Sequence, residues 1–229
     1  VFRNVCALRI KEEGKIMLYG ALEAGGTKMI CGICKENGEI VEQTSIPTKT
    51  PDETIPKIID FFRGKDIVAL GIACFGPIDL HPSSETYGYI TSTPKIAWQN
   101  YPIVPVIQKA LSIPIGFDTD VNGSLLGEVS YGSSRGIENA VYITIGTGIG
   151  GGVLSNGKLL HGMLHPELGH MALVPHEKDH FGGNCPFHKN CFEGMASGPA
   201  MEARYGKKAD KLSDVPLVWE MEAYYIGQA

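Results

Sequence analysis

Short runs of β-branched and aliphatic residues, interrupted by glycine turns, are the main pattern of the chain. The run Val141 to Gly152 stops at Gly146-Thr147-Gly148 and then resumes, which predicts two buried strands joined by a glycine turn. The same pattern occurs earlier, where Met17 to Glu23 and Met29 to Lys35 flank the turn Gly25-Gly26-Thr27-Lys28. The chain therefore carries two similar strand, turn, strand units.

An Asn-Gly pair follows the second strand of each unit, at Asn37-Gly38 and at Asn156-Gly157. Asn-Gly favours a type I′ hairpin, in which both central residues have positive φ. We expect third strands over Glu39 to Ile46 and Lys158 to Leu160. Because the two units lie about half a chain apart, they predict two related domains that face one nucleotide across a cleft.

Helical periodicity and continuous apolar runs alternate between these units. Pro51 to Phe62 has apolar residues at helical spacing, and its proline suits a first turn. Ile67 to Cys74 and Ile113 to Phe117 are apolar throughout, as expected of strands that are covered on both faces. A helix is expected after Asp120, and Leu217 to Ile226 is also helix-like. The fold class is therefore α/β, in which ligands bind at the carboxyl ends of the strands.

Composition narrows the function classes. The 229 residues carry a net charge of −5, and their Lys and Arg are scattered, which gives no support to a nucleic-acid or membrane partner. No apolar run is long enough to cross a bilayer, and the opening residues lack a secretory signal, so we expect a cytoplasmic protein. We expect residues 1–16 to be a non-native or disordered leader, 17–117 to form the N-terminal α/β domain, and 118–229 to form a second α/β domain that is incomplete at its C-terminus.

Both glycine turns are candidate phosphate sites. Glycines let successive N–H groups converge on an anion, and a threonine adds a side-chain donor. The candidate residues are Gly25, Gly26, Thr27 and Lys28 in the first turn, and Gly146, Thr147 and Gly148 in the second. Strand-connecting glycines are also common for steric reasons alone, but the matched pair favours phosphate binding.

Polar residues after two further strands are candidates for substrate chemistry. Asp120 follows a buried strand and begins a helix, where its carboxylate can accept a proton from a substrate hydroxyl; we expect Asp118, facing the other way, to be an N-cap. A loop with Thr93-Pro94-Lys95, Trp98 and Asn100 could hold a polyhydroxylated ring. An ordinary surface loop with one buried tryptophan explains the same residues equally well.

Cys185, His188 and Cys191 place three metal-capable side chains within seven residues. A fourth ligand, His170, His176 or His180, would complete a closed, structural zinc site. The alternatives are a disulfide, which a reducing compartment opposes, and unrelated surface residues. Cys31 and Cys34 would point to opposite faces of one strand, so we interpret them, with Cys74, as core cysteines.

These motifs together resemble the ROK family of sugar kinases and repressors, and within it the bacterial fructokinase branch. The resemblance runs from Met17 to the end of the chain. It depends on the following stretches: Glu23 to Lys28, Thr93 to Trp98, Asp118 to Asn122, Gly146 to Gly150, Glu167 to His170, and Cys185 to Cys191. Glu23, in place of the usual Asp, and His188, within the zinc motif, are the two features that indicate the fructokinase branch.

The resemblance implies an actin-like, ribonuclease H-like ATPase fold and ATP-dependent phosphorylation of a hexose, with D-fructose giving fructose 6-phosphate. By the same resemblance, Asp120 is the base, Thr147 contacts ATP phosphate, and Glu167, His170 and Glu193 contact the sugar. The implied zinc ligands are His170, Cys185, His188 and Cys191. Mg²⁺ would bridge the phosphates with help from Glu23.

We further expect a homodimer with a hexose as substrate. Three alternatives stay open at this point: a kinase for glucose, mannose or an N-acylhexosamine, a sugar-responsive repressor, and a non-catalytic sugar- or zinc-binding module. A repressor would need a DNA-binding helix-turn-helix before the first strand, and the residues ahead of Met17 lack that pattern.

Overall fold

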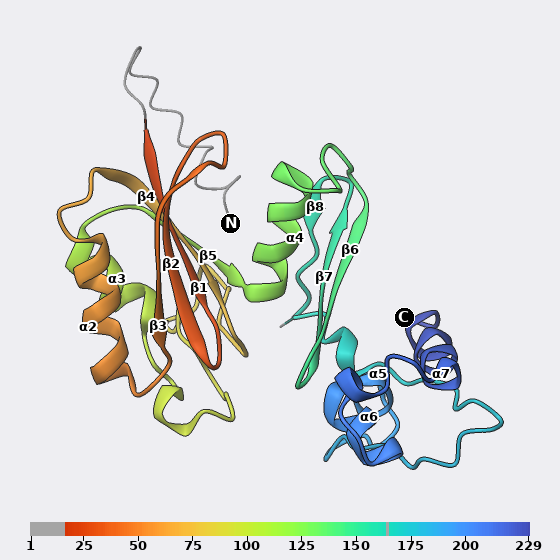
Figure 1. Cartoon of the computed structure of the whole chain (residues 1–229). Helices are drawn as coiled ribbons and strands as arrows, with labels where there is room; N and C mark the ends of the chain where they lie inside the picture. The colour runs from red at the N-terminus through yellow and green to blue at the C-terminus, as the bar shows by residue number, and fades with distance from the viewer. Residues whose placement is uncertain (1–16, 164) are drawn as a thin grey trace. The chain divides into compact units, whose positions relative to one another are not determined.

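The computed structural model describes residues 17–163 and 165–229, and it separates into two compact units (Figure 1). The first unit runs up to Ala140 and includes Leu154–His165, and the second comprises Val141–Val153 and Pro166–Ala229. The leader predicted for residues 1–16 lies outside the described residues.

The first unit is built on a five-stranded sheet in the order β3-β2-β1-β4-β5. Its strands are β1 Leu18–Ala24, β2 Lys28–Lys35, β3 Ile40–Pro47, β4 Ile67–Cys74 and β5 Ile115–Thr119. The first three pair antiparallel, whereas β4 is parallel to both β1 and β5. The α/β fold class predicted from the sequence is confirmed.

Two helices cover one face of this sheet (Figure 1). Helix α2, Pro51–Phe62, begins with its proline as predicted and buries Ile55, Ile58 and Phe62. Helix α3, Ile103–Leu111, was not predicted, although Ile103, Val104 and Ile107 on it are buried. Both helices pack on a core of aliphatic side chains from the strands, including Leu22, Met29, Leu70 and Ile72. Helix α4, Asp120–Tyr131, follows β5 directly.

The two Asn-Gly turns differ in backbone conformation. Asn156 and Gly157 have φ of 51° and 71°, so the predicted type I′ geometry is confirmed there. Of the other pair, only Gly38 has positive φ, so the type I′ prediction is wrong. The Asn37 side chain instead accepts a hydrogen bond from the Glu39 N–H, and this turn still joins β2 to β3.

A three-stranded sheet in the order β6-β7-β8 carries the second glycine turn. Its strands are β6 Ala140–Ile145, β7 Ile149–Ser155 and β8 Lys158–Leu159. Of these strands, β8 belongs to the first unit by sequence. The second unit also contains short helices: η2 Leu168–His170, α5 Phe192–Ala196, α6 Gly198–Tyr205, η3 Ala209–Lys211 and α7 Pro216–Ile226. The Ser197 hydroxyl caps α6 by accepting from the Ala200 N–H, as the sequence predicted.

A buried ion cluster joins these helices around Arg204. The guanidinium of Arg204 lies 3.1 Å from Asp179 and 3.2 Å from Glu222, and it donates to the Met195 carbonyl at 2.7 Å. The Tyr225 hydroxyl donates to the Asp179 carboxylate at 2.6 Å. The cluster therefore ties the loop that contains Asp179 to α6 and α7.

The cysteines at 31, 34 and 74 are buried, and Cys31 and Cys34 pack in different core clusters. The prediction of core cysteines on opposite faces is confirmed. Across the described part of the chain, no helix combines the length and the apolar character that crossing a membrane would require.

Candidate functional site

The carboxyl ends of three parallel strands meet at one edge of the first sheet. Ala24 at the end of β1 pairs with Cys74 of β4, which in turn pairs with Thr119 of β5. The first glycine turn follows β1, and Asp120 follows β5. The strand register therefore brings a candidate phosphate turn and a candidate base to the same edge, where α/β proteins bind ligands.

Close backbone contacts hold the first glycine turn. The Gly25 N–H donates to the Lys28 carbonyl at 3.2 Å, and a Cβ on Gly25 would lie only 2.6 Å from that oxygen. The Thr48 hydroxyl donates to the Gly25 carbonyl at 2.8 Å, and the Thr48 N–H donates to the Thr27 carbonyl at 3.0 Å. The residue after β3 thus fixes the turn, a contact that the sequence analysis missed because nothing in the spacing links Thr48 to Gly25.

Asp120 is the first residue of α4 and is half-buried. Its side chain accepts from the Val121 N–H at 2.9 Å. Asp120 and Glu23 both line a pocket of ≈ 310 Å³ on the face of the sheet below α4. The pKa of the Cys74 thiol lies well above its usual value, first because the thiol is buried and second because the Asp120 carboxylate is near. Asp120 is thus an acidic group at the end of β5, beside the thiol that ends β4.

Asp118 does not cap α4, so that prediction is wrong. The cap is Thr119, whose side chain accepts from the Asn122 N–H. Asp118 is buried on β5, where its carboxylate accepts from Asn122 Nδ2 at 2.8 Å and lies 2.9 Å from His161 Nε2. His161 was not predicted from the sequence, because a lone histidine after a strand carries no spacing signal.

The tryptophan of the Thr93 to Trp98 loop belongs to the core. Trp98 is 1% exposed, and it packs edge-on against Phe75 and Tyr101 with ring centroids 6.0 Å and 5.5 Å away. Its indole N–H donates to the Lys49 carbonyl at 2.7 Å. Since a side chain this buried cannot stack on a sugar ring, the alternative of a loop with one buried tryptophan is the correct one for Trp98.

The second glycine turn is held by α5 and α6. The Gly146 N–H donates to the Gly148 carbonyl at 2.9 Å. The Gly198 N–H, at the start of α6, donates to the Gly146 carbonyl at 2.8 Å. The Glu193 carboxylate accepts from the Ile149 N–H at 2.9 Å, and a Cβ on Gly148 would lie 2.7 Å from that carboxylate. Thr147 itself is exposed. Glu193, which the resemblance assigns to the sugar, thus supports the turn that would hold phosphate.

Glu167 and His170 lie at the two ends of the single turn η2. Glu167 is exposed and has φ of 50°, while His170 is half-buried. Between them, Gly169 must be glycine because a Cβ there would collide with the carbonyl of Ile149. The residues that the resemblance assigns to the sugar therefore all lie in the second unit, on segments that contact the start of β7.

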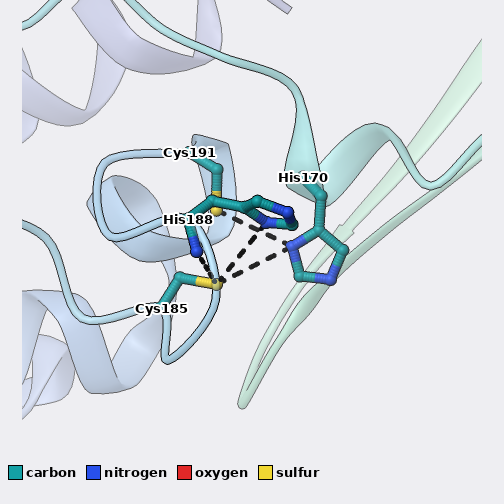
Figure 2. Close-up of side chains that lie close together, drawn as sticks. All are labelled: His170, Cys185, His188 and Cys191. Atoms are coloured by element: carbon teal, nitrogen blue, oxygen red, sulfur yellow. Dashed lines mark hydrogen bonds between the residues drawn. The ribbon is translucent and has the colours of Figure 1, made fainter.

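His170, Cys185, His188 and Cys191 form a compact cluster (Figure 2). Their ligand atoms all lie within 4.8 Å of one another. The Cys185 sulfur is 3.9 Å from Nδ1 of both His170 and His188, and the Cys191 sulfur is 3.7 Å from His170 Nδ1. Of the three candidate fourth residues, the structure brings only His170 to the group. His176 packs against Tyr224 instead, and His180 is exposed.

A tight turn presents the three ligands of the motif. Cys185 and Lys189 bridge to one another, and the Lys189 backbone has φ of 58°. Gly183 and Gly194 pack against this turn so closely that a Cβ on either would collide with the Lys189 carbonyl. Cys191 is the residue before α5, and the Phe192 N–H donates to the Met171 carbonyl next to His170. The loop is therefore folded so that its sulfurs and imidazoles converge.

The cluster fits zinc in chemistry and in spacing. With Zn–S of about 2.3 Å and Zn–N of about 2.0–2.1 Å, a tetrahedral ion separates sulfur from nitrogen by about 3.6 Å, close to the separations found here. Burial raises the pKa of the Cys185 thiol, but the backbone N–H groups of His188 and Phe187, which point at the sulfur, lower it by more. The pKa of Cys185 therefore lies below its usual value. The thiolate that a metal requires is therefore favoured at Cys185, whereas burial raises the pKa of the Cys191 thiol above its usual value.

The ROK family model matches residues 19–222, which is most of the chain. The chain belongs to the ROK family. The resemblance inferred from the glycine turns, Asp120 and the cysteine motif is thereby confirmed.

Individual relatives agree with this assignment to the ROK family. A fructokinase from Streptococcus mutans is 48% identical over 217 residues, which cover 93% of this chain and 73% of that protein. A fructokinase from Lactococcus lactis is 48% identical over 92% of this chain and 72% of its own length. Among solved structures, a ROK hexokinase from Thermus thermophilus matches with a TM-score of 0.73 at 27% identity, over 92% of this chain and 75% of its own. The actin-like fold predicted from the sequence is therefore confirmed.

Proposed function

We propose that this protein is an ATP-dependent hexose kinase that transfers the γ-phosphoryl group of ATP to D-fructose. The observation that carries the proposal is the strand register, which sets the first glycine turn after β1 and Asp120 after β5 at the same carboxyl edge of the sheet, with the parallel strand β4 between them. Such a transfer needs positioning and charge neutralisation more than covalent chemistry. N–H groups of a glycine turn and one carboxylate base supply those two needs.

In the proposed reaction, the 6-hydroxyl oxygen of fructose forms a bond to the γ-phosphorus as the bond from that phosphorus to ADP breaks. Asp120, the first residue of α4, accepts the hydroxyl proton. Mg²⁺, when bound, neutralises phosphate oxygens. Glu23 offers it an oxygen ligand from the same pocket as Asp120. The second turn, Gly146 to Gly148, would bind phosphate as well.

We propose a structural zinc on His170, Cys185, His188 and Cys191, which would fix the loop that carries the candidate sugar residues Glu167 and His170. Fructose is preferred to glucose or mannose as the proposed substrate because relatives at 48% identity over more than nine-tenths of the chain are named fructokinases. The hexokinase of known structure is 27% identical. The second candidate is therefore a broader hexose kinase.

Phosphorylation of fructose, glucose and mannose by the 229-residue chain with ATP and Mg²⁺ tests the proposal, with ADP release as the readout. We expect fructose to be the best acceptor and Asp120→Asn to lower kcat by about 10²–10⁴-fold. Asp118→Asn is the matched control: it weakens a buried carboxylate network, so it should lower the melting temperature and leave kcat of the folded protein near normal. A near-normal rate for Asp120→Asn would remove Asp120 from its role.

A further inference from the structure

Gly26 lies in the first glycine turn, yet its backbone does not require a glycine. Its φ is outside the left-handed region that favours glycine. What the missing side chain permits is a close neighbour: a Cβ on Gly26 would lie 3.0 Å from Lys95 Cε and 3.9 Å from Lys95 Nζ. The Lys95 ammonium therefore lies over the turn that is the candidate phosphate site.

Hydrogen bonds hold Lys95 and the turn in one framework. The backbone N–H of Trp98 donates to the Lys95 carbonyl at 2.7 Å. The indole N–H of the same buried residue donates to the Lys49 carbonyl. The preceding residue, Thr48, bonds to the turn itself through Gly25 and Thr27. Residues 48 and 49 thus connect to the glycine turn on one side and to the loop of Lys95 on the other. The position of Lys95 is fixed by the fold.

The charge of Lys95 has no acidic neighbour among the ion pairs of the described residues. Other lysines of this unit behave differently: Lys49 pairs with Glu53 at 2.8 Å, and Lys65 pairs with Glu42 at 2.6 Å. Lys95 as a whole residue is half-buried. A cation over a glycine turn favours a phosphate at that position, because hydrogen bonds from a charged donor to phosphate oxygens are charge-assisted.

We propose that Lys95 is a phosphate-contacting residue of the transfer reaction, binding peripheral oxygens of the transferred phosphoryl group beside the first glycine turn. The inference rests on the proposed kinase function. Lys95 neither gains nor loses a proton: the sugar oxygen bonds to phosphorus, ADP leaves, and Asp120 takes the hydroxyl proton. Lys95 neutralises charge that grows on the phosphoryl oxygens, which lowers the barrier rather than holding the sugar.

The test compares Lys95→Met, Lys95→Arg and Lys49→Met in the 229-residue chain, measuring kcat and the KM values for ATP and for fructose. Loss of one such donor should lower kcat by about 100-fold in Lys95→Met, with the fructose KM nearly unchanged and partial recovery in Lys95→Arg. Lys49→Met is the matched control, since its ammonium pairs with Glu53 on α2 and is exposed; it should behave like the wild type.

A second measurement uses inorganic tripolyphosphate as the probe. Its affinity should fall about tenfold in Lys95→Met and also in Gly26→Ala, where the added methyl group would displace the lysine. A normal kcat for Lys95→Met, or a raised fructose KM as the main effect, would overturn the inference while leaving the kinase intact. If the wild type neither transfers phosphate nor binds tripolyphosphate, the kinase proposal fails and the role of Lys95 fails with it.

Discussion

Replacing Glu222 by glutamine should remove a pH dependence of stability that arises at the buried Arg204 cluster. Glu222 is 4% exposed, and burial raises the pKa of its carboxyl to about 7, although the Arg204 charge opposes this shift. Arg204 is shared between Glu222 and Asp179, so one cation faces two carboxylates. Protonation of Glu222 leaves a balanced pair of charges, whereas its ionisation leaves an excess negative charge in the interior.

The direction of the effect follows from proton binding. Because its folded pKa lies above the unfolded value of 4.5, Glu222 binds a proton more tightly in the folded state. Its contribution to stability is greatest at low pH and is lost as the pH rises from about 4.5 through about 7. At 1.36 kcal/mol per pKa unit, the loss between pH 5 and pH 8 is about 2 to 3 kcal/mol. The glutamine variant avoids this loss because it cannot ionise.

Urea unfolding of the wild type and of Glu222→Gln between pH 5 and pH 8 measures the effect. The difference between the two free energies of unfolding cancels other titrating groups, and it should shift by about 2 to 3 kcal/mol in favour of the variant as the pH rises. Glu220→Gln, an exposed change on the same helix, should show no such shift. A difference that stays constant with pH would refute the reasoning.

Further predictions concern the metal, the core and a turn. Cys185→Ala should abolish zinc binding, measured as metal per chain after dialysis, and zinc retained by this variant would contradict the site. The core variant Cys34→Ala is the control and should bind zinc like the wild type. Trp98→Ala should lower the free energy of unfolding by about 3–5 kcal/mol, against much less for Trp98→Phe, and equal costs would argue against core packing. Gly157→Ala, at φ of 71°, should cost about 1 kcal/mol by urea unfolding, and no cost would contradict that turn geometry.

The elements at the candidate site could be predicted because their signals are local. A β-branched run that stops at a glycine turn marks a strand end, and Cys-x-x-His-x-x-Cys brings three ligands together within a single loop. The spacing alone left His170, His176 and His180 open, and the family resemblance implied His170; the contact between η2 and the loop before α5 brings that histidine to the cluster. That both glycine turns face one cleft stays a prediction.

The errors share a physical cause, which is that backbone hydrogen bonds and long-range packing decide between locally equivalent residues. Asp118 and Thr119 are both good N-caps, and the carboxylate of Asp118 is instead used by Asn122 and His161. Helix α3 was missed because Pro105 interrupts its pattern, although its buried face packs on the sheet. Asn37 uses its side chain to bond Glu39 and keeps negative φ.

A short run of contacts connects the cysteine cluster to the second glycine turn. Cys191 precedes α5, and Glu193, two residues later, holds the Ile149 amide that follows the turn. An ion bound at the cluster would therefore help to hold the backbone that follows the second glycine turn. Under the proposed function, removing zinc by chelation should therefore weaken ATP binding at this turn as well as loosen the loop that carries Glu167.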